Sequence, residues 1–157
     1  MTMRALLLCA LLLGAASADE MRYPASGAPA VTFAVPEGWS AKEVDGKLQA
    51  AAPDGSATVT MAIVPWTGAM EQLAGETLAA AEMDPPGGKT AVSIAGQHGF
   101  MFHAQQTAGG RTRAVLFCDV ALGSGKALTG ILVADDEDSS SRHEGLKLLD
   151  HLTLVPN

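Results

Sequence analysis

Alternating apolar and polar positions mark several β-strands along the chain. The clearest run is residues 57–63, where Ala57, Val59, Met61 and Ile63 are separated by smaller or polar residues. Successive side chains of a strand point to opposite faces, so this pattern is typical of a half-buried strand. Weaker versions of the pattern predict further strands at residues 31–35, 47–51, 90–94, 98–106, 111–121, 126–133 and 152–155.

The apolar period changes to that of a helix between residues 69 and 83. Positions three and four apart are then apolar or small, which is typical of one face of an amphipathic helix. These positions are Met70, Leu73, Ala74, Thr77, Leu78 and Ala81. The sequence Asp-Pro-Pro-Gly-Gly at 84–88 ends this helix, and a second helix is predicted at 137–149.

Short connections join most of the predicted strands, for example residues 95–97, 108–110 and 123–125. Connections of this length allow antiparallel hairpins but not the longer crossovers of parallel strands. The sequence therefore predicts an α+β fold, an antiparallel β-sheet flanked by helices. We expect one domain over 31–157, preceded by a flexible, Pro-containing lead-in at 19–30.

The first 18 residues have the pattern of a secretory signal peptide. Arg4 supplies the positive charge, residues 5–13 are apolar, and Ala16-Ser17-Ala18 matches a cleavage site. The apolar run is shorter than the roughly 20 residues that span a bilayer. Cys9 follows a leucine within this run, so it is interpreted as part of the apolar segment. The sequence predicts secretion or export to the periplasm, with cleavage after Ala18 and no stable membrane insertion afterwards.

Composition and charge argue against a nucleic-acid-binding protein. The 157 residues include 10 Lys and Arg against 17 Asp and Glu, a formal charge of −7. Loss of Arg4 with the leader would make this −8. Affinity for nucleic acid comes mainly from clustered Lys and Arg, so no nucleic-acid partner is expected.

Cys118 would be the only cysteine left after cleavage, which excludes a disulfide within the mature chain. A reactive thiol or a bridge to another chain is one interpretation. Strand alternation instead places Cys118 on the same face as Leu116, Val120 and Leu122. That setting favours a small, inert core residue.

Imidazole and thioether groups suit soft metals, which makes His98, Met101 and His103 a candidate metal site. In a regular strand, however, His98 points away from the other two unless a bulge at Gly99 changes the register. The favoured interpretation is a pair of ordinary strand histidines. A two-ligand site of Met101 and His103 is the one metal-binding alternative left open.

Asp119 interrupts an apolar strand and shares a face with Val115 and Phe117. Arg111 and Arg113 have the same parity and are close enough in sequence to pair with it. A salt bridge at the margin of the sheet is therefore the simpler interpretation, and a functional carboxylate the other.

Local motifs supply no catalytic, cofactor or metal-binding residue that we would assign. Residues 123–126 (GSGK) lack the rest of a phosphate-binding loop and fit a hairpin turn. His143 lacks the second histidine of a zinc-protease helix, since Lys147 stands there. The acidic run 135–138 lacks the spacing of a calcium loop and fits the entrance of a helix.

Residues 31–39 (VTFAVPEGW) combine a strand with the motif Pro-x-Gly-Trp. Two strands, a helix, an Ile-x-Gly turn at 94–96 and a meander follow, and this order resembles the PsbP-like superfamily over about residues 30–156. That group includes an extrinsic photosystem subunit, periplasmic DcrB-like bacterial proteins and a nuclear-import factor of similar fold. The resemblance implies an α/β/α sandwich, with members that mostly bind or assemble other proteins.

Three functional hypotheses follow, in order. The first is an exported, non-catalytic periplasmic protein that binds or helps assemble a protein complex of the cell envelope. The second is a carrier of a small ligand or a metal, with Met101 and His103 as candidate ligands. The third is an enzyme in which Asp119 and a histidine act as acid and base.

Overall fold

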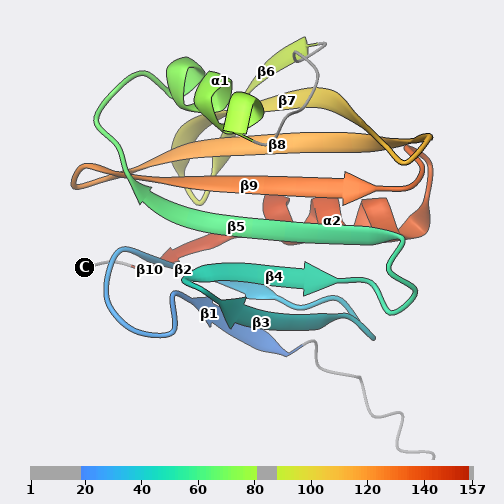
Figure 1. Ribbon diagram of the computed structural model, residues 1–157. Helices are drawn as coiled ribbons and strands as arrows, with labels where there is room; N and C mark the ends of the chain where they lie inside the picture. The colour runs from blue at the N-terminus through green and yellow to red at the C-terminus, as the bar shows by residue number, and fades with distance from the viewer. Residues whose placement is uncertain (1–18, 81–87, 156–157) are drawn as a thin grey trace, which may run out of the picture.

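The computed structural model describes residues 19–80 and 88–155. Within these residues the chain forms strands and two helices in an order close to the predicted one (Figure 1). In chain order the elements are β1 (Glu20–Tyr23), β2 (Ala30–Ala34), β3 (Ser40–Val44), β4 (Lys47–Ala51), β5 (Ala57–Pro65), α1 (Met70–Ala80), β6 (Gly88–Ile94), β7 (Gln97–Ala108), β8 (Arg111–Gly123), β9 (Lys126–Ala134), α2 (Ser140–Asp150) and β10 (Thr153–Val155).

The strands form two antiparallel sheets. The larger sheet has seven strands in the order β3-β4-β5-β9-β8-β7-β6, and the smaller has three in the order β1-β2-β10. Tight turns join the hairpins of the larger sheet, as in the β8–β9 turn, where residues 123–125 all have positive φ. The predicted α+β fold with antiparallel sheet and flanking helices is confirmed.

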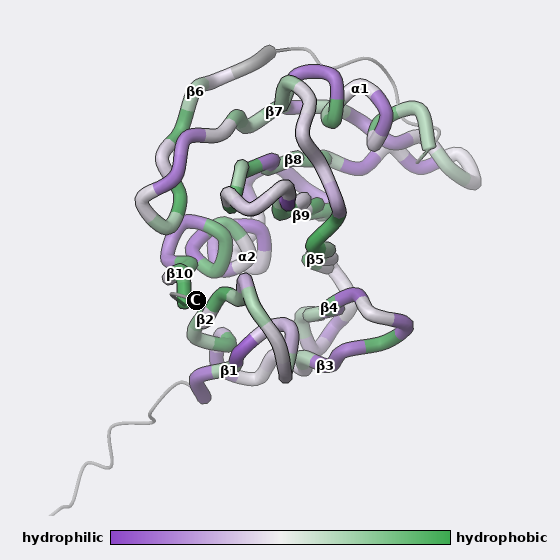
Figure 2. Tube along the Cα trace, turned by 90° about the vertical axis from the view of Figure 1, so that its left-hand side faces the viewer, coloured by the Kyte–Doolittle hydropathy of each residue, from purple (hydrophilic) through white to green (hydrophobic). Residues whose placement is uncertain are grey.

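The two faces of the larger sheet are covered differently. Helix α2 and the smaller sheet pack on one face, whereas α1 lies on the other (Figure 2). The main core lies between the larger sheet and α2 with the smaller sheet. It contains Tyr23, Val31, Phe33, Leu48, Val59, Met61, Cys118, Val120, Leu128, Leu132, Leu148 and Leu149.

A second, smaller core lies under α1. Ala74 and Leu78 of the helix pack with Phe102 of β7 and with Val115 and Phe117 of β8. Leu73, Ala74 and Leu78 are the buried residues of α1, as the helical period predicts. Helix α1 therefore covers the β7–β8 side of this sheet face.

Residues 20–23 correct the prediction of a flexible lead-in at 19–30. They form β1, which pairs with β2, while β2 pairs on its other side with β10. The Tyr23 side chain is buried, and its hydroxyl donates a hydrogen bond to the Gly46 carbonyl at 2.7 Å. The folded domain thus begins before residue 31, because the N-terminal segment completes a sheet with the other end of the chain.

Two further details differ from the prediction. Strand β3 was not predicted, because its sequence SAKEV is mostly exposed and lacks apolar alternation. Helix α2 begins at Ser140 rather than at 137, because the Ser139 hydroxyl caps it by accepting a hydrogen bond from the Arg142 amide at 3.1 Å. The acidic residues 135–138 precede the cap.

The predicted signal peptide and residues 81–87, where the first helix was expected to end, lie outside the described residues. In the described part of the chain, neither helix has the length and apolar character needed to cross a membrane.

Candidate functional site

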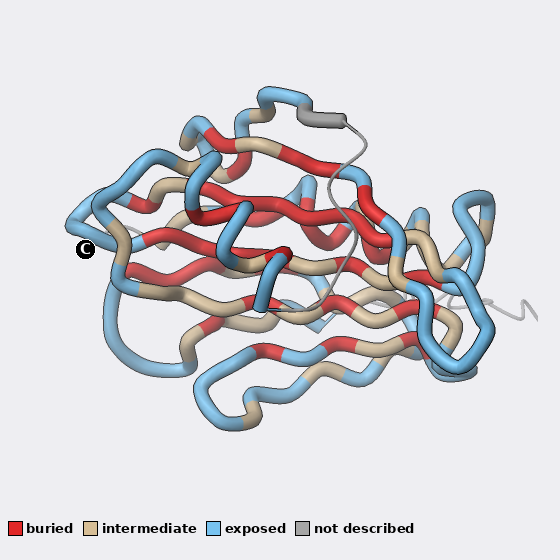
Figure 3. The backbone as a smooth tube through the Cα atoms, turned by 45° about the horizontal axis from the view of Figure 1, so that its top comes forward, coloured by how far each residue is buried: buried red, intermediate tan, exposed pale blue. Residues whose placement is uncertain are grey.

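Half of the α1-side face of the larger sheet has no helix over it. On β5, Ala57, Val59 and Met61 are fully buried toward the main core, whereas the alternate residues Thr58 and Thr60 are only half-buried. Figure 3 shows buried positions alternating with more accessible ones along the strands. Strand β4 repeats this contrast, with Leu48 and Ala50 buried and Lys47 and Gln49 exposed. Ladder pairing places Lys42, Lys47, Gln49, Thr58 and Thr60 on one surface, which we call the open face.

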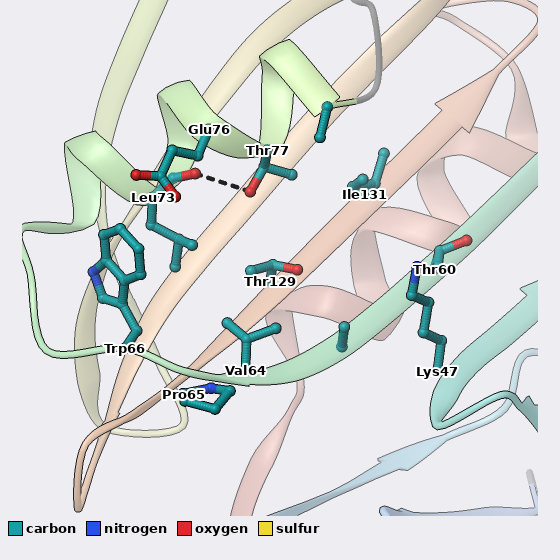
Figure 4. A pocket seen from close by; sticks show the side chains of 12 residues that line it. Lys47, Thr60, Val64, Pro65, Trp66, Leu73, Glu76, Thr77, Thr129 and Ile131 are labelled. Atoms are coloured by element: carbon teal, nitrogen blue, oxygen red, sulfur yellow. Dashed lines mark hydrogen bonds between the residues drawn. The ribbon is translucent and has the colours of Figure 1, made fainter.

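A groove of about 580 Å³ lies where the open face meets α1 (Figure 4). Its floor comes from β5 and β9, and one wall comes from α1. Among the described residues its lining is largely apolar, with three threonine hydroxyls and one charged residue of each sign. The lining residues are Lys47, Thr60, Ala62, Val64, Pro65, Trp66, Leu73, Glu76, Thr77, Ala80, Thr129 and Ile131.

Trp66 is fixed at one end of the groove by the turn between β5 and α1. Its indole Nε1 donates to the Ala69 carbonyl at 3.2 Å, and its backbone amide donates to the Gly125 carbonyl at 2.8 Å. The ring packs against Gly68, where an added Cβ would stand 3.0 Å from the indole. An aromatic surface held in this way loses little entropy when a ligand contacts it.

The charges of the groove lie at opposite ends. Lys47 lies at the β4 end, and Glu76 lies on α1 near Trp66 (Figure 4). On the α1 wall, the Thr77 hydroxyl donates to the Leu73 carbonyl at 2.9 Å. The Thr77 hydroxyl is therefore already bonded to the helix backbone. Thr60 and Thr129 provide the hydroxyls of the groove floor.

A second, more polar hollow of about 390 Å³ adjoins the groove. Both hollows include Thr60 in their lining, so they adjoin at this residue of β5. The second hollow adds Lys42, Gln49 and Thr58. Among the described residues, neither Lys42 nor Lys47 forms an ion pair with a carboxylate.

Asp119 lies on the same sheet face, but beneath the covered half. It is fully buried, and it pairs in register with Phe100 on β7 and with Thr129 on β9. Neither carboxylate oxygen has a hydrogen-bond partner among the described residues. Burial raises the pKa of Asp119 to about 7, because removal from water penalises the charged form.

The predicted salt bridge of Asp119 is wrong. Arg113 instead contacts Asp135 at 2.9 Å, and Arg111 contacts the same carboxylate at 3.4 Å. Asp135 follows β9 immediately, and β9 pairs with β8, so it reaches the arginine end of β8. Asp119 lies further along β8, in the apolar interior.

In the part of the chain that it describes, the structure does not bring the candidate metal ligands His98, Met101 and His103 together with other metal-binding side chains. Met101 is buried in the main core, whereas His98 and His103 are exposed. The β6–β7 and β7–β8 ladders run past Gly99 without a register shift, so His98 points away from Met101 and His103. Within the described residues, no three His, Cys, Asp or Glu side chains cluster closely enough to hold a metal ion.

Cys118 lies in the main core, as the strand alternation predicts. Burial raises the pKa of its thiol, and the nearby charges of Asp119 and Asp150 raise it further. Because the thiolate is the reactive form, this cysteine is inert in the folded chain.

The groove residues were not singled out from the sequence. Trp66 could not be recognised as a groove residue from the sequence, because its position depends on the β5–α1 turn that holds it at one end of the groove. A usable signal was present on β5, where the outward positions 58, 60 and 62 carry only small side chains. Small outward residues beside a helix leave room for a groove.

Comparison with known proteins establishes the fold. No protein-family model and no curated protein sequence matches the chain. Among solved structures, LpqN of Mycobacterium tuberculosis, described as involved in cell envelope biogenesis, matches with a TM-score of 0.61 and 14% identity. The match covers 88% of this chain and 91% of LpqN.

Two further structures agree. A protein from Bacteroides thetaiotaomicron matches with a TM-score of 0.58 and 12% identity, over 81% of this chain and 46% of that one. Cyanobacterial PsbP (CyanoP) from Synechocystis sp. PCC 6803 matches with a TM-score of 0.64 and 16% identity, over 90% of this chain and 96% of CyanoP. The chain therefore has the PsbP-like fold that its sequence resembles.

Proposed function

We propose that this chain is an exported, non-catalytic protein that binds a protein complex of the cell envelope or helps to assemble it. The observation that carries the proposal is the open face with its adjoining groove. An uncovered half-sheet is suited to docking a partner when it offers an apolar groove and lysines that have no ion pair among the described residues.

The leader-like sequence of residues 1–18 supports export. The description of LpqN as involved in cell envelope biogenesis supports an envelope role, by analogy of fold. The groove lining supports binding over catalysis, because its titratable residues in the described part of the chain are Lys47 and Glu76 at opposite ends. Acid–base catalysis needs such groups within reach of one reacting atom.

A small-ligand carrier is the second candidate. The groove volume of about 580 Å³ and its mainly apolar lining favour it, since small-molecule sites commonly have this size and character. A protein partner fits better, because a second, polar hollow on β5, β4 and β3 adjoins the groove and extends the surface beyond what a small ligand would occupy.

The test is a crosslinking experiment in the host cell. The full chain with a C-terminal tag is expressed in its own host, crosslinked in the cells, purified and read by mass spectrometry. The same tag on an unrelated exported protein is the control. One reproducibly enriched envelope complex is the expected result. Recovery of background proteins alone would contradict the proposal, and saturable binding of a small molecule by the purified chain would then favour the carrier.

A further inference from the structure

We propose that the groove and the polar hollow form one docking surface for an extended acidic segment of the partner protein. An apolar side chain of the segment occupies the groove between Trp66 and Ile131, and carboxylates of the segment meet Lys47 and Lys42. This inference rests on the proposed function and names the chemistry of the partner.

Register places the two lysines on the path that leads out of the groove. Thr60 pairs with Gln49, Gln49 pairs with Lys42, and Val44 pairs with Lys47. Lys42 and Lys47 are thus diagonal neighbours on the face that carries Thr60. A segment leaving the groove across β5 meets Lys47 on β4 first and Lys42 on β3 next.

Strand spacing sets the length of the segment. The groove floor is on β9 and Lys42 is on β3, three strands away in the order β9-β5-β4-β3. Three spacings of about 4.8 Å give roughly 14 Å, which an extended chain covers in about four residues. We therefore expect the carboxylates to lie about three to five residues from the apolar side chain.

The charged residues around the groove predict both the charge of the segment and the direction in which it runs. The chain as a whole has a formal charge of −7, yet the open face presents two lysines that have no ion pair within the described part of the chain. Glu76 stands at the opposite, Trp66 end of the groove (Figure 4). Complementary charge therefore directs the acidic part of the segment toward β3 and away from α1.

The groove end offers an anchor for the apolar side chain. Trp66 is held by its bond to Ala69, Leu73 is buried on the facing helix, and Ile131 is half-buried on the floor. Rigid apolar surfaces of this kind carry much of the energy in protein interfaces, while surrounding charges supply specificity. Lys42, Gln49 and Thr58 outside the groove suit an extended peptide better than a lipid tail.

The test uses a displayed library of random 12-residue peptides, selected on the purified chain of residues 19–157. The chain carries Trp39→Phe, so that Trp66 fluorescence reports directly on groove binding. We expect the selected peptides to share one apolar residue with acidic residues three to five positions away. The double substitution Lys42→Gln and Lys47→Gln is expected to weaken their binding about tenfold.

The matched control is Arg142→Gln with Lys147→Gln, which removes the same charge from α2 on the other side of the sheet. Binding by this control is expected to be unchanged. The inference is overturned if no peptide is selected, if the consensus lacks acidic residues, or if both double variants bind equally. It is also overturned if phosphatidylglycerol vesicles, rather than peptides, change Trp66 fluorescence in a manner that requires both lysines.

The peptide selection tests the docking surface, and the in-host crosslinking tests the proposed function, so failure of one can be told from failure of the other. A partner complex recovered in cells together with a failed selection leaves the proposed function standing and removes this surface. Absence of any envelope complex removes the proposed function.

Discussion

Asp119 is a buried carboxyl group with no hydrogen-bond partner among the described residues, and such a group makes folding stability depend on pH. Its pKa is about 7 in the folded chain, against an ordinary value of 3.8. Between those values the unfolded chain ionises this group while the folded chain keeps it protonated. Protonated Asp119 therefore stabilises the folded chain fully below about pH 4, and this stabilisation is lost as pH rises through 7. The linked free energy is of the order of 4 kcal/mol.

Asp119→Asn removes this titration while keeping the side-chain shape. We expect the free energy of unfolding of the variant, relative to the parent chain, to rise between pH 4 and pH 8 by up to about 4 kcal/mol. Urea denaturation at several pH values measures the difference. The same substitution at exposed Asp45 is the control. A difference for Asp119→Asn that does not change with pH would show that the carboxyl finds a partner or water.

Cys118 gives a second test at the level of a single residue. Because its side chain is fully buried and the pKa of its thiol is raised, we expect no reaction with a thiol reagent in the native chain at pH 8. Full reaction is expected in 6 M guanidinium chloride. Rapid labelling under native conditions would mean that the β8–α2 core opens readily.

The face on which these residues lie was predictable, but their partners were not. Alternation along an unbroken strand places Asp119 on the same sheet face as Phe117 and places Cys118 on the other face, and the structure agrees. The pairing of Arg113 with Asp135 depends on the β8–β9 register, which apolar alternation does not specify. The sequence therefore placed Arg113 on the correct face of the sheet but predicted Asp119, not Asp135, as its partner.

Among the elements, α1 and α2 each contain one glycine. Gly75 is exposed on the outer side of α1, whereas Gly145 is buried on the side of α2 that faces the sheet. An added Cβ at Gly75 on α1 meets no atom within 4 Å, whereas at Gly145 on α2 it would stand 2.7 Å from Leu132 and 3.3 Å from Trp39. Gly75→Ala is expected to raise the free energy of unfolding by about 0.5–1 kcal/mol.

Gly145→Ala is expected to lower the free energy of unfolding by about 1–3 kcal/mol, because overpacking outweighs the gain in helix propensity. Chemical denaturation of both variants measures the two effects side by side. Stabilisation by Gly145→Ala would contradict the close packing of α2 on the sheet.

Strand β1 is tied to the fold through Tyr23. Its hydroxyl donates to Gly46 and accepts from the Ile63 amide at 3.3 Å, which links the smaller sheet to β5 and to the β3–β4 turn. Tyr23→Phe is expected to cost about 1–2 kcal/mol of unfolding free energy. Thr107→Val, which removes an exposed hydroxyl near Thr112, is the control and should cost less than about 0.5 kcal/mol. Equal effects would mean that β1 contributes little.

Prediction of elements succeeded where apolar alternation was long and failed where strands were short or exposed. Strands β5, β7, β8 and β9 each bury one or both faces, and their patterns were visible. Strand β1 has four residues, and its pairing through β2 to β10 joins the two ends of the chain. No local pattern encodes such a contact.

At the scale of the whole molecule, asymmetric coverage of the larger sheet links the fold to binding. Helix α2 and the smaller sheet cover the main core on one face, while α1 covers the β7–β8 side of the other. The sequence predicted the sheet and both helices. It did not predict the groove, because that depends on where α1 lies across the strands.

The most direct measurement places a photo-crosslinking amino acid on the open face in the living host. Gln49→p-benzoylphenylalanine lies on this face, and the same replacement at Lys147 lies on α2 as the control. We predict that irradiation crosslinks an envelope protein from position 49 and not from position 147, and that Lys42→Gln with Lys47→Gln reduces the product. Crosslinking from position 147 alone would contradict the account.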